Sequence, residues 1–303
     1  MNDEAYSPDS TIEAYRSVRQ ADCAERAFML DAVGIRSEMR FEAPFYLLRV
    51  DRADAERAAE QLALYERERR PPPPPAPLPA GEPHAWVGSA LYAAMLVYIG
   101  LAVSNGLWGA EAFDAGTLDA ARVHAGQWWR AWTALTLHLD GQHLGANLVV
   151  GSLFGYLAGR QQGPGHAWFL VVSGAAASNL LEASLAPPIY RAVGASTAVF
   201  TALGLLCAYT WGTGARWSRR WALQWAPLVT GAVLLAWFGS GDPATPGQVD
   251  VVAHALGFGL GLLLGVATSR SRVRELSRQI PQWITGALAV AQIGLAWFLA
   301  LSR

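Results

Sequence analysis

The chain has 303 residues, of which 52% are hydrophobic and 16% charged, and its formal net charge is -1 at pH 7. Soluble domains carry about 25% charged residues, so this composition indicates a membrane protein. A nucleic-acid-binding surface needs an excess of basic side chains, which the near-neutral charge excludes. All basic side chains are arginine, which excludes a serine–lysine dyad and Schiff-base chemistry. The two cysteines, Cys23 and Cys207, give no basis for a disulfide framework.

Residues 1–70 hold most of the charge and predict a small soluble α+β domain. Apolar spacing predicts a helix over 21–33, strands over 39–41 and 45–50, and a second helix over 54–68. No residue pattern in this domain indicates catalysis.

Residues 71–85 form a proline-rich linker that begins with five consecutive prolines. Proline lacks the backbone N–H that a helix or a sheet requires, so we predict a stiff, extended spacer. The linker marks the boundary of the N-terminal domain.

Beyond the linker, apolar stretches close to the roughly 20 residues needed to cross a bilayer recur along the chain. The stretches are 86–106, 138–159, 166–185, 193–212, 221–240, 249–268 and 281–301. The segment between the first two is polar in places and rich in tryptophan, so we expect it to lie in the membrane interface. The sequence thus predicts an all-α polytopic membrane bundle with seven crossings.

The arginines in the loops predict the orientation of this bundle. With the N-terminal domain in the cytoplasm, eight arginines fall in cytoplasmic loops and four on the outer side. The first group is Arg160, Arg216, Arg219, Arg220, Arg270, Arg272, Arg274 and Arg278, and the second is Arg122, Arg130, Arg191 and Arg303. The positive-inside rule therefore places the N-terminus in the cytoplasm and the C-terminus outside. The lysine-free, arginine- and alanine-rich composition indicates a bacterial inner (plasma) membrane.

Polar side chains within a crossing are costly and suggest function. We single out His143 and Asn147 in the second crossing, Ser196 in the fourth and His254 in the sixth. The predicted orientation places all four near the outer ends of their helices, where they can meet.

Each of these polar groups heads a helical face that continues in glycine, which allows helices to approach closely. The faces hold Gly151, Gly155 and Gly159 in the second crossing, Gly204 in the fourth, and Gly257, Gly261 and Gly265 in the sixth. Taken singly, glycine faces are typical of packing, a serine at a helix start of capping, and a buried histidine of a structural hydrogen bond. Together they favour a common site at the interface of the three helices.

Several motifs occur in a fixed order along the chain. They are Trp129-Arg130, Thr133, His138 and His143-x-x-x-Asn147, then FLVVSG over 169–174, Gly194-Ala195-Ser196-Thr197, and Ala253-His254-x-x-Gly257-x-x-x-Gly261. This ordered set, spanning 86–268, resembles the rhomboid family of intramembrane serine proteases. Thr197 departs from the pattern, since the family very often has a second glycine there, and this puts the turnover rate in question.

The resemblance implies a six-helix rhomboid protease core over 86–268, with 281–301 as an additional transmembrane helix. It implies an intramembrane serine endopeptidase that uses a dyad of Ser196 and His254, without cofactor or metal. With no lysine in the chain, His254 is also the natural base on chemical grounds. The oxyanion would be stabilised by the Ser196 backbone N–H and, by resemblance, by the side chains of His143 and Asn147. The supporting residues would be Gly194, Trp129, Arg130, His138, Phe200, Gly257 and Gly261.

Some roles stay open at this level. Trp129 and Arg130, at the outer interface, fit equally an aromatic belt with a snorkelling arginine or the fixing of the first external loop. Phe200, one turn after Ser196, would pack against His254 or serve only the core. Asp250, one turn before His254, would orient that histidine or face solvent at a loop end.

The expected substrates are single-pass transmembrane proteins that enter from the bilayer, with a helix weakened by glycine or proline near the cut. An alternative is a catalytically inactive rhomboid-like protein that binds transmembrane clients, although both dyad residues are present. No His-Glu-x-x-His motif supports a zinc protease. A transporter or receptor would predict internal repeats or charges along a midplane path, and neither occurs.

Overall fold

The computed structural model describes residues 10–69, 81–214, 221–239 and 250–302. The chain divides into two compact units, Met1–Pro79 and Ala80–Arg303. Most of the predicted linker, over 70–80, lies outside the described residues, as do the predicted loop arginines at 216, 219 and 220.

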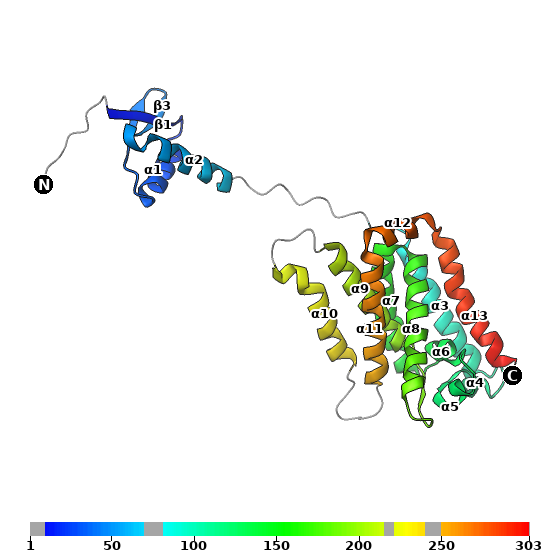
Figure 1. Ribbon diagram of the computed structural model, residues 1–303. Coiled ribbons are helices and arrows are strands. Elements are labelled where there is room, and N and C mark those ends of the chain that lie inside the picture. The colour runs from blue at the N-terminus through cyan, green and yellow to red at the C-terminus, as the bar shows by residue number, and fades with distance from the viewer. Residues whose placement is uncertain (1–9, 70–80, 215–220, 240–249, 303) are drawn as a thin grey trace. The chain divides into compact units, whose positions relative to one another are not determined.

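The N-terminal unit is a small α+β fold (Figure 1). Its elements are β1 (Thr11–Ser17), α1 (Gln20–Ala32), β2 (Ser37–Glu42), β3 (Phe45–Asp51), the short 3-10 helix η2 (Arg52–Asp54) and α2 (Ala55–Arg69). The antiparallel sheet has the order β1-β3-β2, and its core joins Leu30 and Leu62 of the helices to Leu48 and Val50 of β3. The sequence predicted both helices and the last two strands but missed β1. An irregularity between Glu13 and Tyr15 breaks the two-residue alternation that would have indicated this strand.

The second unit is a helical bundle in which seven long helices coincide, within three residues at each end, with the seven predicted apolar stretches. Among the described residues these are α3 (Ala85–Ser104), α7 (Gly141–Gln162), α8 (Pro164–Leu185), α9 (Ser196–Gly214), α10 (Trp221–Gly239), α11 (Val251–Ser269) and α13 (Gln282–Leu301). Four of them, α3, α8, α11 and α13, are long and apolar enough to cross a membrane. The predicted helical bundle is therefore confirmed.

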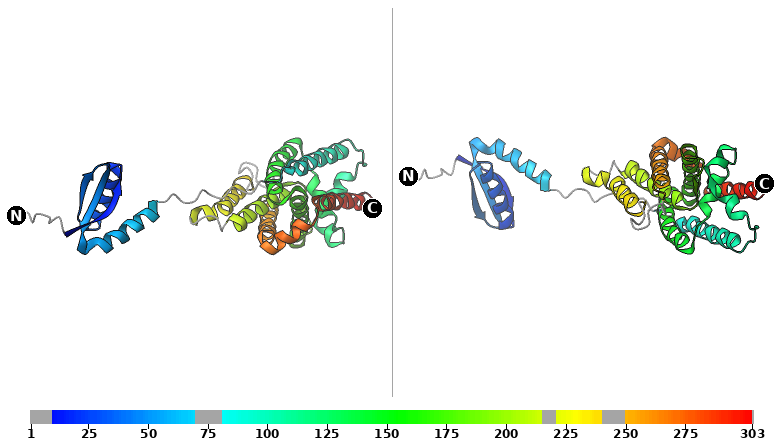
Figure 2. Two further views of the ribbon diagram at one scale, coloured as in Figure 1. Left: turned by 90° about the horizontal axis from the view of Figure 1, so that it is seen from above. Right: turned by 90° about the horizontal axis from the view of Figure 1, so that it is seen from below.

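Helices α9 and α11 pack most closely, and α10 lies at one edge of the bundle (Figures 1 and 2). A Cβ added at Gly261 of α11 would lie 2.9 Å from the backbone nitrogen of Leu205, and one at Gly265 would lie 2.6 Å from the Leu205 carbonyl oxygen. The glycine face of α11 therefore meets the backbone of α9, as predicted.

The glycine face of α7 does not join that interface, contrary to the prediction. A Cβ at Gly151 would lie 2.8 Å from Cζ of Tyr92 in α3, and one at Gly155 would lie 2.7 Å from Cη2 of Trp168 in α8. These two aromatic rings stack on each other, with centroids 4.7 Å apart. Gly151 and Gly155 thus make room for large rings, whereas Gly159, the third glycine of this face, lies against Ala85 of α3 and the backbone of Pro164 in α8.

Short elements cover one end of the bundle, near the C-terminus of α13 (Figure 1). Between α3 and α7 run α4 (Ala112–Gly116), β4 (Leu118–Asp119), α5 (Ala120–His124), α6 (Arg130–Thr133) and the 3-10 helix η3 (Ala134–Thr136). None is long enough to cross a bilayer, as predicted for this segment. Strand β4 pairs with β5 (Arg191–Ala192), which leads into α9. Helix α12 (Ser271–Gln279) lies at the opposite end of the bundle.

Candidate functional site

Ser196 is the first residue of α9, and Gly194, two residues earlier, sets the backbone conformation of the segment that enters this helix. Gly194 has φ +141°, a backbone conformation that favours glycine, and its N–H donates to the Ala134 carbonyl oxygen at 2.9 Å. A Cβ at Gly194 would lie 2.9 Å from His143 Cε1, 3.0 Å from His143 Nε2 and 3.5 Å from Ser196 Oγ. The missing side chain thus lets the imidazole of His143 and the hydroxyl of Ser196 flank the same point.

His143 and Asn147 occupy the first two turns of α7. Asp140 caps this helix by accepting the His143 backbone N–H at 2.8 Å. Asn147 is buried, and its Nδ2 donates to the His143 carbonyl oxygen at 3.0 Å. An amide nitrogen carries two protons, so this bond leaves Asn147 a second donor.

His138 precedes α7 and lies beside the same group. Its ring centroid is 5.0 Å from that of His143, and its Nε2 accepts the Ala195 backbone N–H at 3.4 Å. Because Nε2 accepts, the proton of a neutral His138 ring is on Nδ1. His138 therefore supports the turn that precedes Ser196.

His254 lies in the first turn of α11 and is 5% exposed. Its ring centroid is 4.5 Å from that of Phe200, so the expected ring contact is present. Phe200 is four residues after Ser196 and shares its face of α9. The nucleophile candidate and the base candidate thus occupy adjoining turns of two tightly packed helices.

Asp250 caps α11 by accepting the Ala253 backbone N–H at 3.0 Å through Oδ1, and its Oδ2 accepts the Tyr190 hydroxyl. Burial, together with the Asp250 carboxylate, raises the pKa of Tyr190. Asp250 stands at the end of a loop, as predicted, but its side chain is only partly exposed. Its position ties the start of α11 to the loop that leads from α8 to α9.

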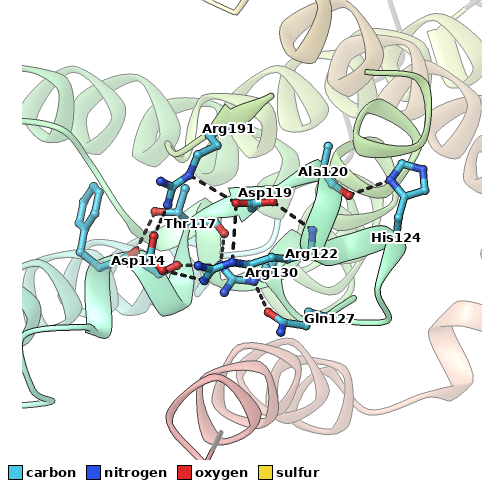
Figure 3. Close-up of polar contacts among 10 residues, drawn as sticks. Asp114, Thr117, Asp119, Ala120, Arg122, His124, Gln127, Arg130 and Arg191 are labelled. Carbon is cyan, nitrogen blue, oxygen red and sulfur yellow. Dashed lines mark hydrogen bonds and ion pairs between the residues drawn. The ribbon is translucent and has the colours of Figure 1, made fainter. Parts of the chain in front are cut away.

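Arg130 fixes the loop that precedes α7 (Figure 3). It is 3% exposed, donates to the backbone carbonyl oxygens of Asp114 and Thr117 at 2.7 Å each, and donates to Gln127 Oε1 at 2.6 Å. Trp129 is also buried, in an apolar cluster that includes Trp297 of α13. These contacts support loop fixing over the alternative of an aromatic belt with a snorkelling arginine.

Asp114 links the same loop to the segment that enters α9. Its carboxylate accepts Arg122 at 2.7 Å and also pairs with Arg191 of β5 (Figure 3). Burial acts to raise the pKa of Asp114, but hydrogen bonds from Arg191 and Arg122 outweigh it and hold that pKa below its ordinary value. The β4–β5 pairing runs through Asp119 and Arg191, so the loop and the approach to Ser196 are held together by both backbone and charge.

Sequence reasoning missed two polar residues in the third crossing. Asn179 is buried and donates through Nδ2 to the Ala131 carbonyl oxygen at 2.8 Å, and Glu182, also buried, lies near Tyr190 and Asp250. Both are polar side chains within an apolar crossing, which is the criterion that singled out His143 and His254. The predicted set of polar residues was therefore incomplete.

The contacts of α13 were missed as well. Trp297 Nε1 donates to Thr136 Oγ1 at 3.0 Å, and Gln292 Oε1 accepts Trp132 Nε1 at 3.0 Å and the Ser173 hydroxyl at 3.1 Å. Thr136 lies in η3, whose first residue accepts the Gly194 N–H. Two glutamines within the last apolar stretch were the available signal.

Within the described residues no group of three or more histidine, cysteine or acidic side chains could hold a metal ion. No curated protein matches the chain. Residues 125–271 match the family model of the Rhomboid domain, and this span contains Arg130, His143, Ser196 and His254. With this domain and its apolar helices, the chain belongs to the rhomboid family and is a multi-pass membrane protein.

Proposed function

We propose that the chain is an intramembrane serine endopeptidase in which Ser196 is the nucleophile and His254 its base. One observation carries the proposal: Ser196 begins α9 beside the His143 imidazole, while His254 packs against Phe200, one turn along the same helix. Ser196 is partly exposed, as a group that must reach substrate requires, whereas His254 is buried.

In the proposed reaction, His254 takes the proton of the Ser196 hydroxyl as its oxygen attacks the scissile carbonyl carbon. The protonated His254 then gives this proton to the leaving amine, and an acyl ester remains on Ser196. Water hydrolyses the ester with His254 again as base. Serine needs such a partner because its hydroxyl is a weak nucleophile at its free pKa.

The oxyanion that forms during attack would accept hydrogen bonds from three groups. The Ser196 backbone N–H lies at the positive end of α9, the His143 ring lies beside the Gly194 α-carbon, and Asn147 retains a second amide proton. Each preorganised donor typically contributes about 3–4 kcal/mol to transition-state stabilisation.

For the topology, we propose six crossings over 86–268 as the protease core, a seventh over 281–301, and residues 1–70 as a cytoplasmic domain joined by the linker over 71–85. The arginine distribution supports a cytoplasmic N-terminus, and the lysine-free, arginine- and alanine-rich composition supports a bacterial plasma membrane. The site would then open to the outer aqueous side, which supplies water, and single-pass transmembrane substrates would enter from the bilayer.

The test is labelling of the detergent-solubilised full-length chain with a fluorophosphonate probe, followed by mass spectrometry of the labelled peptide. We expect the adduct on Ser196 and its loss in Ser196→Ala and His254→Ala. Matched controls are Ser184→Ala and His84→Ala, whose side chains are exposed. Cleavage of a model transmembrane substrate should follow the same pattern.

An adduct on another residue would refute the nucleophile assignment. Failure of the folded wild-type chain to label, combined with binding of a transmembrane peptide, would instead identify the non-catalytic client-binding protein.

A further inference from the structure

A cavity of about 250 Å³ is lined by residues of α12 and by Tyr209 near the C-terminal end of α9, the helix that Ser196 begins. We call it the α12 cavity. Its polar wall includes His166, Arg274 and Arg278, and its apolar wall includes Phe169, Leu170 and Ile280. A pocket that combines cationic and apolar walls fits an amphipathic ligand better than a free ion.

Helix α12 joins the two candidate membrane spans α11 and α13, so the cavity lies where both spans end. The helix carries arginines at 272, 274 and 278 and apolar residues at 273 and 276. An amphipathic helix of this composition is typical of the membrane–water interface, where lipid headgroups lie.

The cavity wall contains a buried donor without a partner. The Gln282 Oε1 accepts the His166 backbone N–H at 3.1 Å, which orients the amide so that its Nε2 donates to the Gln162 carbonyl oxygen and to His166 Nδ1. Because Nδ1 accepts, the neutral His166 ring carries its proton on Nε2.

His166 is 8% exposed, and within the described residues its Nε2 has no hydrogen-bond partner; the same holds for Nε2 of Gln162. Both residues line the cavity. Buried donors are normally satisfied. Neither atom is accessible from the cavity in this structure, so an acceptor in the cavity reaches them only when the side chains turn toward it.

The cations at this wall also lack acidic partners. Arg274 and Arg278 are four residues apart, so they share one face of α12, and neither forms an ion pair within the described part of the chain. Guanidinium groups bind phosphate oxygens through paired N–H donors. Two arginines and two amide or imidazole donors together suit a phosphate group.

We propose that the α12 cavity binds an anionic phospholipid, with its phosphate between Arg274, Arg278 and the His166 wall and its acyl chains along Phe169, Leu170 and Ile280. The site is separate from the proposed peptidase chemistry and would persist in a catalytically inactive chain. It would anchor α12 and the start of α13 to the lipid.

The test is native mass spectrometry of the full-length chain from micelles that contain equimolar phosphatidylglycerol and phosphatidylcholine. We expect the wild-type chain to retain phosphatidylglycerol. The double variant Arg274→Gln/Arg278→Gln lacks both phosphate ligands, so its phosphatidylglycerol occupancy should be at least about tenfold lower. The matched control is Arg270→Gln/Arg272→Gln, which removes the same charge from residues outside the cavity lining. It should stay within about twofold of wild type.

Equal loss in both double variants would show attraction by net charge alone and overturn the site, as would retention in both. A second arm adds inorganic phosphate at constant ionic strength. Retained phosphatidylglycerol supports the lipid, whereas displacement at millimolar phosphate would identify a free phosphate site and overturn the lipid assignment.

Discussion

Gly257→Ala is the sharpest probe of how α11 holds His254 against α9. A Cβ at position 257 would lie 2.6 Å from the carbonyl oxygen of Thr197, the residue after Ser196, and 3.2 Å from Cγ2 of the same threonine. The nearer atom belongs to the backbone, so no side-chain rotation relieves the overlap. Restoring van der Waals distance requires the helices to separate by on the order of 1 Å.

Overpacking of this kind costs about 1–3 kcal/mol, against a gain of about 1 kcal/mol from replacing glycine by alanine in a helix. Gly259→Ala is the matched control, because a Cβ there has no neighbour within 4 Å. It should be neutral or slightly stabilising, so the two variants should differ by about 2 kcal/mol in the free energy of unfolding.

The assay compares the melting temperatures of the two variants in one detergent and the rates at which a fluorophosphonate labels Ser196. A difference of about 2 kcal/mol corresponds to about 4–8 °C in a unit of this size. Displacement by about 1 Å at a reacting centre can cost about 100-fold in rate. If Gly257→Ala melts and labels like Gly259→Ala, the close approach of the two helices at this position is wrong.

Three further outcomes test the loop and α13. Asp114→Asn should make the melting temperature depend less on pH in the acid range. The lowered pKa of Asp114 means that its carboxylate stabilises the fold above its ordinary pKa of 3.8 and that this contribution is lost as pH falls below it. Melting temperatures measured between pH 3 and 6 test this. Arg130→Gln should cost about 2–3 kcal/mol by leaving buried carbonyl groups unsatisfied and should expose residues 105–128 to limited proteolysis. Trp297→Phe removes the donor to Thr136 and should lower the free energy of thermal unfolding by about 1 kcal/mol. The control Trp283→Phe, at an exposed position, should lower it little. Equal losses in the two variants would exclude that hydrogen bond as the cause.

The long helices could be predicted because a segment that lies in lipid must satisfy its backbone internally and stay apolar for its whole length. That requirement acts on each segment separately, so one sequence carries the signal. Strand β1 depends instead on pairing with β3, which begins 34 residues after the start of β1 at Thr11. Its irregular register also removed the two-residue alternation that predicts a strand. The short α4–α6 segment likewise owes its shape to contacts made by Arg130 and Asp114.

The candidate site divides in the same way. The order of the motifs around His143, Ser196 and His254 could be recognised in the sequence. In the structure the His143 ring lies near Ser196, and the His254 ring contacts Phe200. The hydrogen-bond partner of Trp297 could not be predicted, because Thr136 is 161 residues away. A tryptophan in an apolar stretch carries no local sign of which helix will accept its N–H.

The contacts of α13 bear on where the functional unit of this chain ends. The rhomboid match stops at residue 271, yet Gln282, Gln292 and Trp297 each make hydrogen bonds to residues within it. Such bonds between membrane helices contribute about 0.6–2 kcal/mol each. A helix that acted only as an added anchor would need none of them. Because Trp297 supports η3, and η3 accepts the Gly194 N–H two residues before Ser196, α13 belongs physically to the structure that positions the proposed nucleophile.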